Sequence, residues 1–448
     1  MIRVNRDHLR GHPHGDDVLR ILESALSSIN PFALIDQQAS VCGDTLQFGK
    51  LKISLAGRRI WILSIGKASV PMARAIEVLL GPERLSGGVA VTRTGYGGFV
   101  ERINVIEAGH PLPKGTDGAD AVMAVADQVG PDDLVLCLLS GGGSALLASP
   151  PPGVPLSDLA RTTELLLQSG VTIDEMNTVR RHLSQLQGGR LMARLHPATV
   201  VTLILSDVIG DRLESIASGP TVPDPTSFAD ACSVLKRVGL FEDIPQSVRA
   251  HLLAGDASAV PDTPNPGDPI FQEAHTILLG NNDTAVRAMA ATAQALGFDV
   301  NVNPSPLLGE AREIGVRVAD QAVALAASAT SKWALVAGGE TTVTVRGDGL
   351  GGRNQELALA AATRLDGAAG ISLASLATDG TDGPTDAAGG LIDGRTIPLL
   401  RQRGMDVGTV LDRNDSHAAL AMTEDLLWTG PTSTNVADLV LVLGEPTV

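Results

Sequence analysis

The chain has 448 residues, of which 44% are hydrophobic, 19% charged and 2% aromatic, and its formal net charge is −16. This composition is typical of a folded protein, and the length accommodates two or three domains with cores of their own. The negative charge argues against a nucleic-acid partner, because duplex binding requires a basic surface, and the scarcity of aromatic residues argues against a base-stacking surface.

The cysteines and the hydropathy pattern favour a reducing, aqueous compartment. Cys42, Cys137 and Cys232 are odd in number, widely spaced and without a C-x-x-C motif, so we expect free thiols rather than disulfides. No apolar run reaches the roughly 18 residues of a membrane span, and the N-terminal residues lack the apolar core of a signal peptide. We therefore expect a cytoplasmic protein without a membrane partner.

The first half of the chain alternates helix-period stretches with short, continuously apolar runs. Helices are expected at 16–29, 69–80, 118–129 and 156–169. Strands are expected at 60–65, 88–92, 103–108, 133–139 and 199–205. Apolar runs without alternation suit strands that are covered on both faces, so these residues predict a parallel sheet flanked by helices.

The second half begins with a stretch, 244–269, that carries proline, glycine and aspartate at the density of a linker, so we predict a domain boundary there. Beyond it, strands are expected at 275–280, 333–339, 341–347, 371–377 and 438–443, and helices at 283–296, 309–329 and 354–365. The predicted fold class is α/β, with one domain over 1–245 and a second over 246–448, whose last segment could pack back on the first.

A glycine-rich turn, SGGGSALL (140–147), follows the strand at 133–139. A serine nucleophile would need the pattern G-x-S-x-G, but Leu146 stands two residues after Ser144 where glycine is required. A strand, a glycine loop and a helix start would instead present backbone N–H groups to an anion, and glycines permit its close approach. We expect residues 140–144 to cradle a phosphate, with a turn that binds no ligand as the alternative.

Two more polar groups follow apolar strands. Lys67 lies in ILSIGKAS (62–69), which is not a P-loop because Trp61 occupies the position of the first glycine. A lysine at the tip of a parallel strand either extends to solvent or faces an anionic ligand, and ligands gather at that edge. Asp207, and less strongly Asp211, end the run LILSDVIGD (203–211), an arrangement that holds Mg²⁺ in phosphoryl-transfer enzymes, with helix capping as the alternative.

The stretch TTVTVRGDGLGGRNQE (341–356) contains the pattern G-x-G-x-x-G at Gly347, Gly349 and Gly352. With Asp379 at the end of a later apolar run, it would indicate a nicotinamide-dependent reductase. However, its alternating threonines and valines suit a half-exposed strand. Arg353 at the helix start also opposes the helix dipole unless an anion binds there. We interpret the stretch as an anion site around Arg353.

The stretch TDGTDGPTDAAGG (378–390) places Asp379, Asp382 and Asp386 among glycines. It lacks the glycine and the final glutamate of an EF-hand loop. We expect these carboxylates to assist a Mg²⁺ ion or to hold a polyol, with a solvated turn as the alternative.

In chain order, several stretches resemble one enzyme family. The resemblance is carried by SIGKAS, GHPLP, SGGGSAL, NTVRRHLSQLQGGRL, SDVIGDRLESIASGPTVPDPT, GGETTVTVRGDGLGGRNQE, TDGTDGPTDAAGG and TGPTSTNVADL, which span nearly the whole chain. Together they resemble glycerate 2-kinases, the class II glycerate kinase family, whose members often carry the older label hydroxypyruvate reductase. The resemblance implies a Rossmann-like N-terminal domain, a smaller C-terminal α/β domain and an active site in the cleft between them.

The resemblance also implies a reaction and its residues. The γ-phosphoryl group of ATP would pass to the 2-hydroxyl of D-glycerate with the help of Mg²⁺, giving 2-phosphoglycerate and ADP. The family's key lysine and arginine fall on Lys67 and Arg353, and Asp207 is the first candidate for the base. Asp207 and Asp211 are expected to hold the metal, and Arg353 or Arg180 to bind the carboxylate of D-glycerate.

The expected nucleotide site comprises Gly66, Ser140, Gly141, Gly142, Gly143, Ser144, Glu340, Asn354 and Asp379. The chain departs from the usual family pattern at Gln187, where a basic residue is common, and at Ser433, where glycine is common. An NAD(P)H-dependent hydroxypyruvate reductase is the alternative function, and a homodimer is one assembly that the sequence allows.

Overall fold

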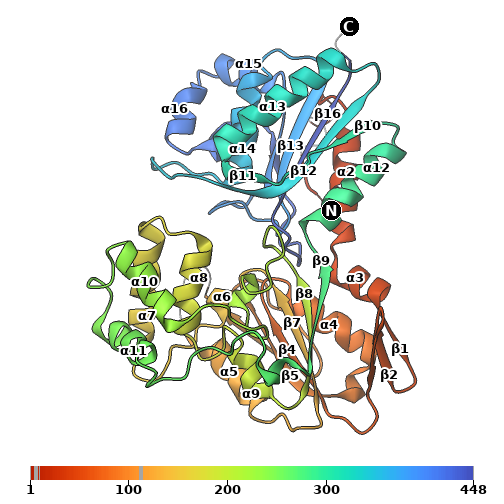
Figure 1. Ribbon diagram of the computed structural model, residues 1–448. Helices are drawn as coiled ribbons and strands as arrows, with labels where there is room; N and C mark the ends of the chain where they lie inside the picture. The colour runs from red at the N-terminus through yellow and green to blue at the C-terminus, as the bar shows by residue number, and fades with distance from the viewer. Residues whose placement is uncertain (1, 5–8, 10, 110–114, 447–448) are drawn as a thin grey trace. The chain divides into compact units, whose positions relative to one another are not determined.

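The computed structural model describes residues 2–4, 9, 11–109 and 115–446, and the chain folds into two units (Figure 1). The N-terminal unit comprises Leu34–Leu279, and the C-terminal unit comprises Met1–Ala33 together with Gly280–Val448. The division therefore falls at Gly280 rather than at residue 246, and the first 33 residues belong with the second half of the chain.

A six-stranded sheet lies at the centre of the N-terminal unit, in the order β6-β5-β4-β7-β8-β9. Its strands are β4 (Ile60–Ile65), β5 (Leu85–Arg93), β6 (Asn104–Ala108), β7 (Leu134–Ser140), β8 (Thr199–Leu205) and β9 (Ala274–Gly280). Every pair from β6 to β8 is parallel. All residues of β4 and β7 are buried, so the parallel sheet expected from these continuously apolar runs is confirmed.

Helices cover both faces of this sheet. Helices α5 (Asp117–Ala126) and α9 (Arg190–Leu195) share a core with the β4 side chains Trp61, Leu63 and Ile65. Side chains alternate along a strand, so Ser64 points to the opposite face, where its hydroxyl donates to the Ser69 carbonyl at the start of α4 (Ser69–Leu80) at 2.7 Å. Counted from β4, the strand order reads 3-2-1-4-5-6, which is the order of a doubly wound sheet.

Two smaller parts complete the N-terminal unit. Helices α7 (Leu156–Gln168), α8 (Ile173–His182), α10 (Phe228–Arg237) and α11 (Gln246–Asp256) share a separate core around Phe228 (Figure 1). Strands β1 (Ala39–Cys42), β2 (Thr45–Phe48) and β3 (Leu51–Ser54) form an antiparallel meander. The stretch predicted as a linker contains α11, because Val248 and Leu252 lie on one face of this helix and are fully buried.

The C-terminal unit has a mixed sheet in the order β10-β12-β16-β13-β14-β15, with β11 beside β12. Its strands are β10 (Asp299–Val302), β11 (Leu307–Glu310), β12 (Trp333–Thr342), β13 (Ile371–Ala377), β14 (Gly389–Asp393), β15 (Leu426–Leu427) and β16 (Asp438–Gly444). The last strand, β16, is antiparallel to both β12 and β13, so the end of the described chain lies in the centre of this sheet.

The helices of this unit are α2 (Gly15–Ser28), α12 (Asn282–Ala295), α13 (Ala311–Ser328), α14 (Arg353–Arg364), α15 (Thr396–Gln402), α16 (Val407–Asp412) and α17 (Ser416–Thr423), while α3 (Pro31–Gln38) crosses the division. Figure 1 shows α2 beside α12, and the hydroxyls of Ser24 and Thr292 join them at 2.7 Å. This contact explains why the first helix belongs to the C-terminal unit.

The strand predicted at 341–347 ends early, at Thr342. Beyond it, side chains replace a neighbouring strand as hydrogen-bond partners: Thr344 N donates to Glu310, and Arg346 N donates to Asn414 Oδ1 at 2.7 Å. Among the described residues, no single helix is long and apolar enough to cross a membrane; α2 and α3 reach that length only as a pair bent by 56°. Cys42, Cys137 and Cys232 are all free thiols.

Candidate functional site

The central strands of the N-terminal sheet, β4 and β7, place two predicted loops side by side. In a doubly wound sheet, ligands bind outside the carboxyl ends of the strands where the strand order reverses, which is here between β4 and β7. The loop with Gly66 and Lys67 follows β4, and the glycine loop at 141–143 follows β7. The topology therefore brings these two sequence-predicted groups to one edge.

The two loops are in direct contact. Lys67 N donates to the Gly141 carbonyl at 2.9 Å, and Ala68 N donates to Ser140 Oγ at 3.0 Å. Gly66 has a φ of 124°, and any side chain there would collide with Ser140. Ser140 is fully buried, so its hydroxyl serves this loop contact and holds the edge together.

The glycine loop itself is tightly packed. Gly142 is left-handed, with a φ of 82°, and a Cβ atom on Gly143 would lie 2.7 Å from that of Ala217. The following helix, α6 (Gly143–Leu146), has only four residues, so backbone N–H groups rather than a long helix dipole would bind an anion here. Gly141, Gly142 and Gly143 thus have the conformation that the cradle interpretation requires.

Ser144 faces another serine rather than a base. Its hydroxyl lies 2.9 Å from that of Ser218, which in turn donates to Asn177 at 3.2 Å. Ala217, Ser218 and Gly219 have left-handed backbones, with φ of 50°, 58° and 63°, and such strained runs cluster at functional sites. No histidine is in hydrogen-bond contact with Ser144 in the described part of the chain, which argues against a nucleophilic role.

Asp207 and Asp211 lie in the loop after β8, the neighbour of β7 in the sheet, and both are partly buried. Asp211 has a left-handed backbone, with a φ of 53°. Within the ranges that the structure describes, no group of three or more histidine, cysteine or acidic side chains could hold a metal ion. Magnesium needs only one or two carboxylates when phosphates complete its coordination, so this loop fits that ion.

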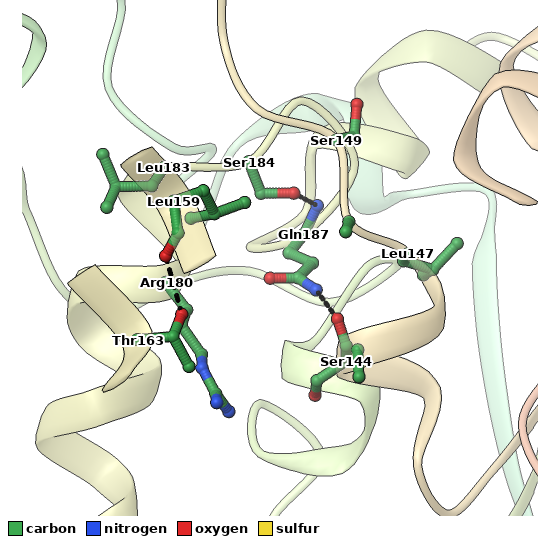
Figure 2. A pocket seen from close by; sticks show the side chains of 11 residues that line it. Ser144, Leu147, Ser149, Leu159, Thr163, Arg180, Leu183, Ser184 and Gln187 are labelled. Carbon is green, nitrogen blue, oxygen red and sulfur yellow. Dashed lines mark hydrogen bonds between the residues drawn. The ribbon is translucent and has the colours of Figure 1, made fainter. Parts of the chain in front are cut away.

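A cavity opens beside the glycine loop, within the N-terminal unit (Figure 2). Its lining includes Ser144 from the loop, Thr163 from α7, Arg180 from α8, and Ser184 and Gln187 from the turn after α8. Burial lowers the pKa of the Arg180 guanidinium below its ordinary value, and no carboxylate of a described residue pairs with it. The cavity therefore carries an uncompensated positive charge.

In the C-terminal unit, Arg353 is surrounded by acids. Its Nε and Nη2 donate to the two carboxylate oxygens of Asp438 at 2.6 and 3.0 Å, and its Nη1 donates to Glu340 at 2.8 Å. Burial would lower the pKa of Arg353, but attraction to Asp438 and Glu340 outweighs it and raises that pKa. The anion that the sequence predicted near this arginine is supplied by the protein itself.

The N-terminus of α14 is likewise occupied from within. Asp382 accepts the backbone N–H groups of Asn354 and Gln355 at 3.1 and 2.9 Å. Asn354 is buried, and its side chain bonds to Asp382, Asp438 and Ser375. Asn354 thus positions these carboxylates, and every polar atom of its side chain has a partner inside the unit.

The acids around Arg353 share a single guanidinium. Burial raises the pKa of Asp438 to about 6, against the attraction of Arg353 and the hydrogen bond from Asn354, with Asp382 adding repulsion. Burial also raises the pKa of Asp382, despite the N–H groups that it accepts. Perturbed carboxylates of this kind are typical of functional sites.

The glycines of the dinucleotide-like pattern pack against their own unit. Gly347 and Gly349 lie against the backbone of Arg413, and a side chain on Gly352 would collide with Asp382. Residues 343–352 separate β12 from α14, whereas a dinucleotide turn joins strand and helix directly. The pattern therefore serves packing, which argues against the reductase alternative.

The carboxylates of 378–390 do not act as a group. Asp379 is buried and accepts the N–H of Thr381 at 3.0 Å, and Asp382 caps α14. Asp386 is exposed and pairs with His417 at 3.2 Å. The structure thus separates the three acids, and most of the GHPLP stretch (His110–Pro113) lies outside the described residues.

The sequence did not identify Asp438. It precedes the last apolar run, and such a residue would lie at the far edge of a parallel strand. Because β16 is antiparallel, Asp438 pairs in register with Gly339 and Ala377 at the carboxyl ends of β12 and β13. Ser218 was also missed, and only its unusual backbone, which the sequence does not show, marks it.

Comparisons with known proteins give consistent results. A family model described as a domain of unknown function (DUF4147) matches residues 17–253, and a MOFRL family model matches 333–438. The chain is 42% identical to a glycerate 2-kinase of Pyrococcus horikoshii over 431 residues, which cover 95% of this chain and 96% of that protein. It is 43% identical to a D-glycerate 2-kinase of Thermotoga maritima over 397 residues, or 86% of this chain and 90% of that protein.

A solved structure is similar as well. The crystal structure of a glycerate kinase from Thermotoga maritima matches with a TM-score of 0.82 and 38% identity, covering 96% of this chain and 99% of that chain. A relative from Agrobacterium vitis, 41% identical over 396 residues (86% of this chain, 87% of that protein), is provisionally named a hydroxypyruvate reductase.

Proposed function

Because the chain belongs to the glycerate 2-kinase family, we propose that it transfers the γ-phosphoryl group of ATP to the 2-hydroxyl of D-glycerate, with Mg²⁺ as the metal. The observation that carries the nucleotide assignment is the contact of two loops at the strand-reversal edge, where Lys67 N bonds to Gly141. Such an edge is where doubly wound sheets bind phosphate-bearing ligands.

Phosphoryl transfer depends mainly on positioning and on neutralising charge. The backbone of Gly141–Gly143 would hold the phosphates of ATP, since glycines let N–H groups approach the oxygens closely. Lys67 from the N-terminal unit and Arg353 from the C-terminal unit would stabilise the charge that develops on the transferring group.

Asp207 and Asp211 would hold the metal, which supplies charge neutralisation on the phosphate oxygens when bound. Asp207 is also the first candidate to accept the proton of the 2-hydroxyl. Glu340 and Asp379 remain candidates for nucleotide contact in the C-terminal unit. Glu340 is half exposed and forms a single ion pair with Arg353, so it can exchange that partner for a ligand.

The proposal is tested with Lys67→Met and Arg353→Met, measuring ADP formation from ATP and D-glycerate. Each variant should lower kcat by about 100-fold or more, since removing a group that stabilises transition-state charge typically costs that much. Arg364→Met is the matched control for Arg353, because Arg364 lies on the same helix and forms an exposed ion pair with Asp320 at 2.7 Å.

A second assay addresses the reductase alternative by following NADH absorbance with hydroxypyruvate. We expect no NADH consumption by the wild-type protein. Turnover of NADH without any ADP formation would reject the kinase assignment, and near-normal kcat in both methionine variants would reject the roles of Lys67 and Arg353.

A further inference from the structure

The cavity beside the glycine loop, here called the Arg180 cavity, is small and polar on one side. It has a volume of about 30 Å³, lies next to Ser144 at the end of the loop, and has an apolar floor that includes Leu147, Leu159 and Leu183 (Figure 2). A site of this volume admits a group the size of one or two water molecules, whereas a purine ring would require side chains to move.

Hydrogen-bond donors without acceptors line the polar side. Arg180 has five N–H donors, and none of them bonds to a described residue. Ser184 accepts the backbone N–H groups of Leu186 and Gln187, each at 3.2 Å, and its own hydrogen has no acceptor among the residues that the structure describes. A ligand that fits this wall must offer acceptors and negative charge.

One acceptor completes the wall. The Nε2 atom of Gln187 donates to the Ser144 carbonyl at 2.9 Å, which fixes the orientation of the amide. In Figure 2 the other amide atom, Oε1, points into the cavity. Thr163 offers no further donor, because its hydroxyl is bonded to the Leu159 carbonyl at 3.0 Å. An amide oxygen beside a guanidinium suits a hydroxyl next to a carboxylate.

Resting on the proposed function, we infer that Arg180 binds the carboxylate of the hydroxy-acid acceptor, with Ser184 as a second donor and Gln187 as the partner of a hydroxyl group. A guanidinium matches a carboxylate through two parallel hydrogen bonds, which gives both affinity and orientation. Arg353, the other candidate for this role, already has Asp438 on two of its nitrogens, whereas Arg180 has no competing carboxylate.

The test uses the full-length variants Arg180→Met and Arg180→Lys. Steady-state kinetics are measured with D-glycerate, with ATP and with glyceramide, the neutral amide of the acid. In R180M the KM for D-glycerate should rise about 10- to 100-fold while the KM for ATP stays within about twofold, because a hydrogen bond to a charged group is lost from acceptor binding only. R180K should be intermediate, because lysine keeps the charge but loses the fork.

Glyceramide separates charge recognition from a general loss of binding. The wild-type protein should prefer D-glycerate to glyceramide, and R180M should lose that preference. The matched control is Arg161→Met on α7, since Arg161 is exposed and pairs with Glu164 at 3.4 Å; it should leave all three parameters unchanged. The melting temperature of R180M should not fall, because Arg180 has no partner to lose.

Three outcomes would overturn the inference while the kinase assignment stands: an unchanged KM for D-glycerate in R180M, a rise confined to the KM for ATP, or a preserved preference for the acid over the amide. If the wild-type protein forms no ADP with D-glycerate, the proposed function itself fails, and this result is distinct from all three.

Discussion

Replacing Asp438 with asparagine should lower activity without lowering stability. Asp438 is nearly inaccessible, and burial raises its pKa from 3.8 to about 6. A shift of about two units corresponds to about 3 kcal/mol by which folding disfavours the ionised carboxylate at neutral pH. Asparagine removes that charge but has a single oxygen for donors on Arg353 and Asn354, so one hydrogen bond, about 1–3 kcal/mol, is lost. The two effects nearly cancel.

The kinetic expectation is different. Without a carboxylate on Nε and Nη2, Arg353 is no longer held by two oxygens, and a misplaced catalytic group typically costs about 10- to 100-fold in kcat. We therefore expect D438N to melt within a few degrees of the wild-type protein at pH 7 while kcat falls by that factor. Calorimetry and a coupled ADP assay measure both.

The pH dependence fixes the sign. The folded pKa of Asp438 lies above its unfolded value, so its contribution to stability is complete below about pH 4 and is lost as the pH rises through about 6. The carboxylate that holds Arg353 forms over the same interval, so kcat should rise while the free energy of unfolding falls. D438N should lack both trends.

The control is Asp348→Asn, which removes an exposed carboxylate from Arg413 in the same unit and should change neither quantity. The reasoning is refuted if D438N unfolds many degrees below the wild-type protein, because Asp438 would then be a net stabilising partner. It is equally refuted if D438N keeps the wild-type kcat.

Gly66→Ala should weaken nucleotide binding and lower the melting temperature of the N-terminal unit, because a Cβ atom would collide with Ser140; Gly57→Ala, with a similarly positive φ of 71° but open space around it, is the control, and equal effects of the two would show that only backbone strain matters. His12→Gln should destabilise the C-terminal unit most between about pH 4 and 6.5, as measured by urea unfolding. Despite burial, the bonds to Asp393 and Asp425 raise the pKa of His12, so its contribution is lost as the pH rises through that pKa; the pKa of Asp393 is lowered to about 2, because His12 and Arg395 outweigh burial, so its contribution is lost only as the pH falls towards 2. A destabilisation that is the same at pH 5.5 and 8.5 would contradict the assignment.

The elements that the sequence predicts best are those whose own side chains determine them. The bounds of β4, β8 and α4 match the expected 60–65, 199–205 and 69–80, because continuous apolar runs and helical periodicity are local signals. The same signals place Lys67 and the 140–144 loop at strand ends. Strand pairing then brings them together, as expected for a parallel sheet.

The features that the sequence could not give depend on distant partners. A proline- and glycine-rich stretch looked like a linker, yet the apolar face of α11 packs it into the helical core. The GGRNQE stretch indicated an anion site, but the anions are Asp382 and Asp438, which lie 26 or more residues away in the chain. Whether β16 runs parallel or antiparallel, which decides where Asp438 lies, is not encoded in β16 alone.

The two arginines considered for anion binding differ in what surrounds them, and this difference assigns their roles. Arg353 faces Asp438 and Glu340, with Asp382 behind them, so an approaching phosphate meets more negative than positive charge. Nε and Nη2 of Arg353 are occupied by the buried Asp438, and only Nη1 is held by an exposed acid, Glu340. A phosphate can therefore reach this guanidinium only by displacing Glu340, and a divalent cation that reduces the net negative charge would favour that exchange. Arg180 needs no exchange, because it has no carboxylate partner among the described residues, and it can bind a monoanionic acid directly.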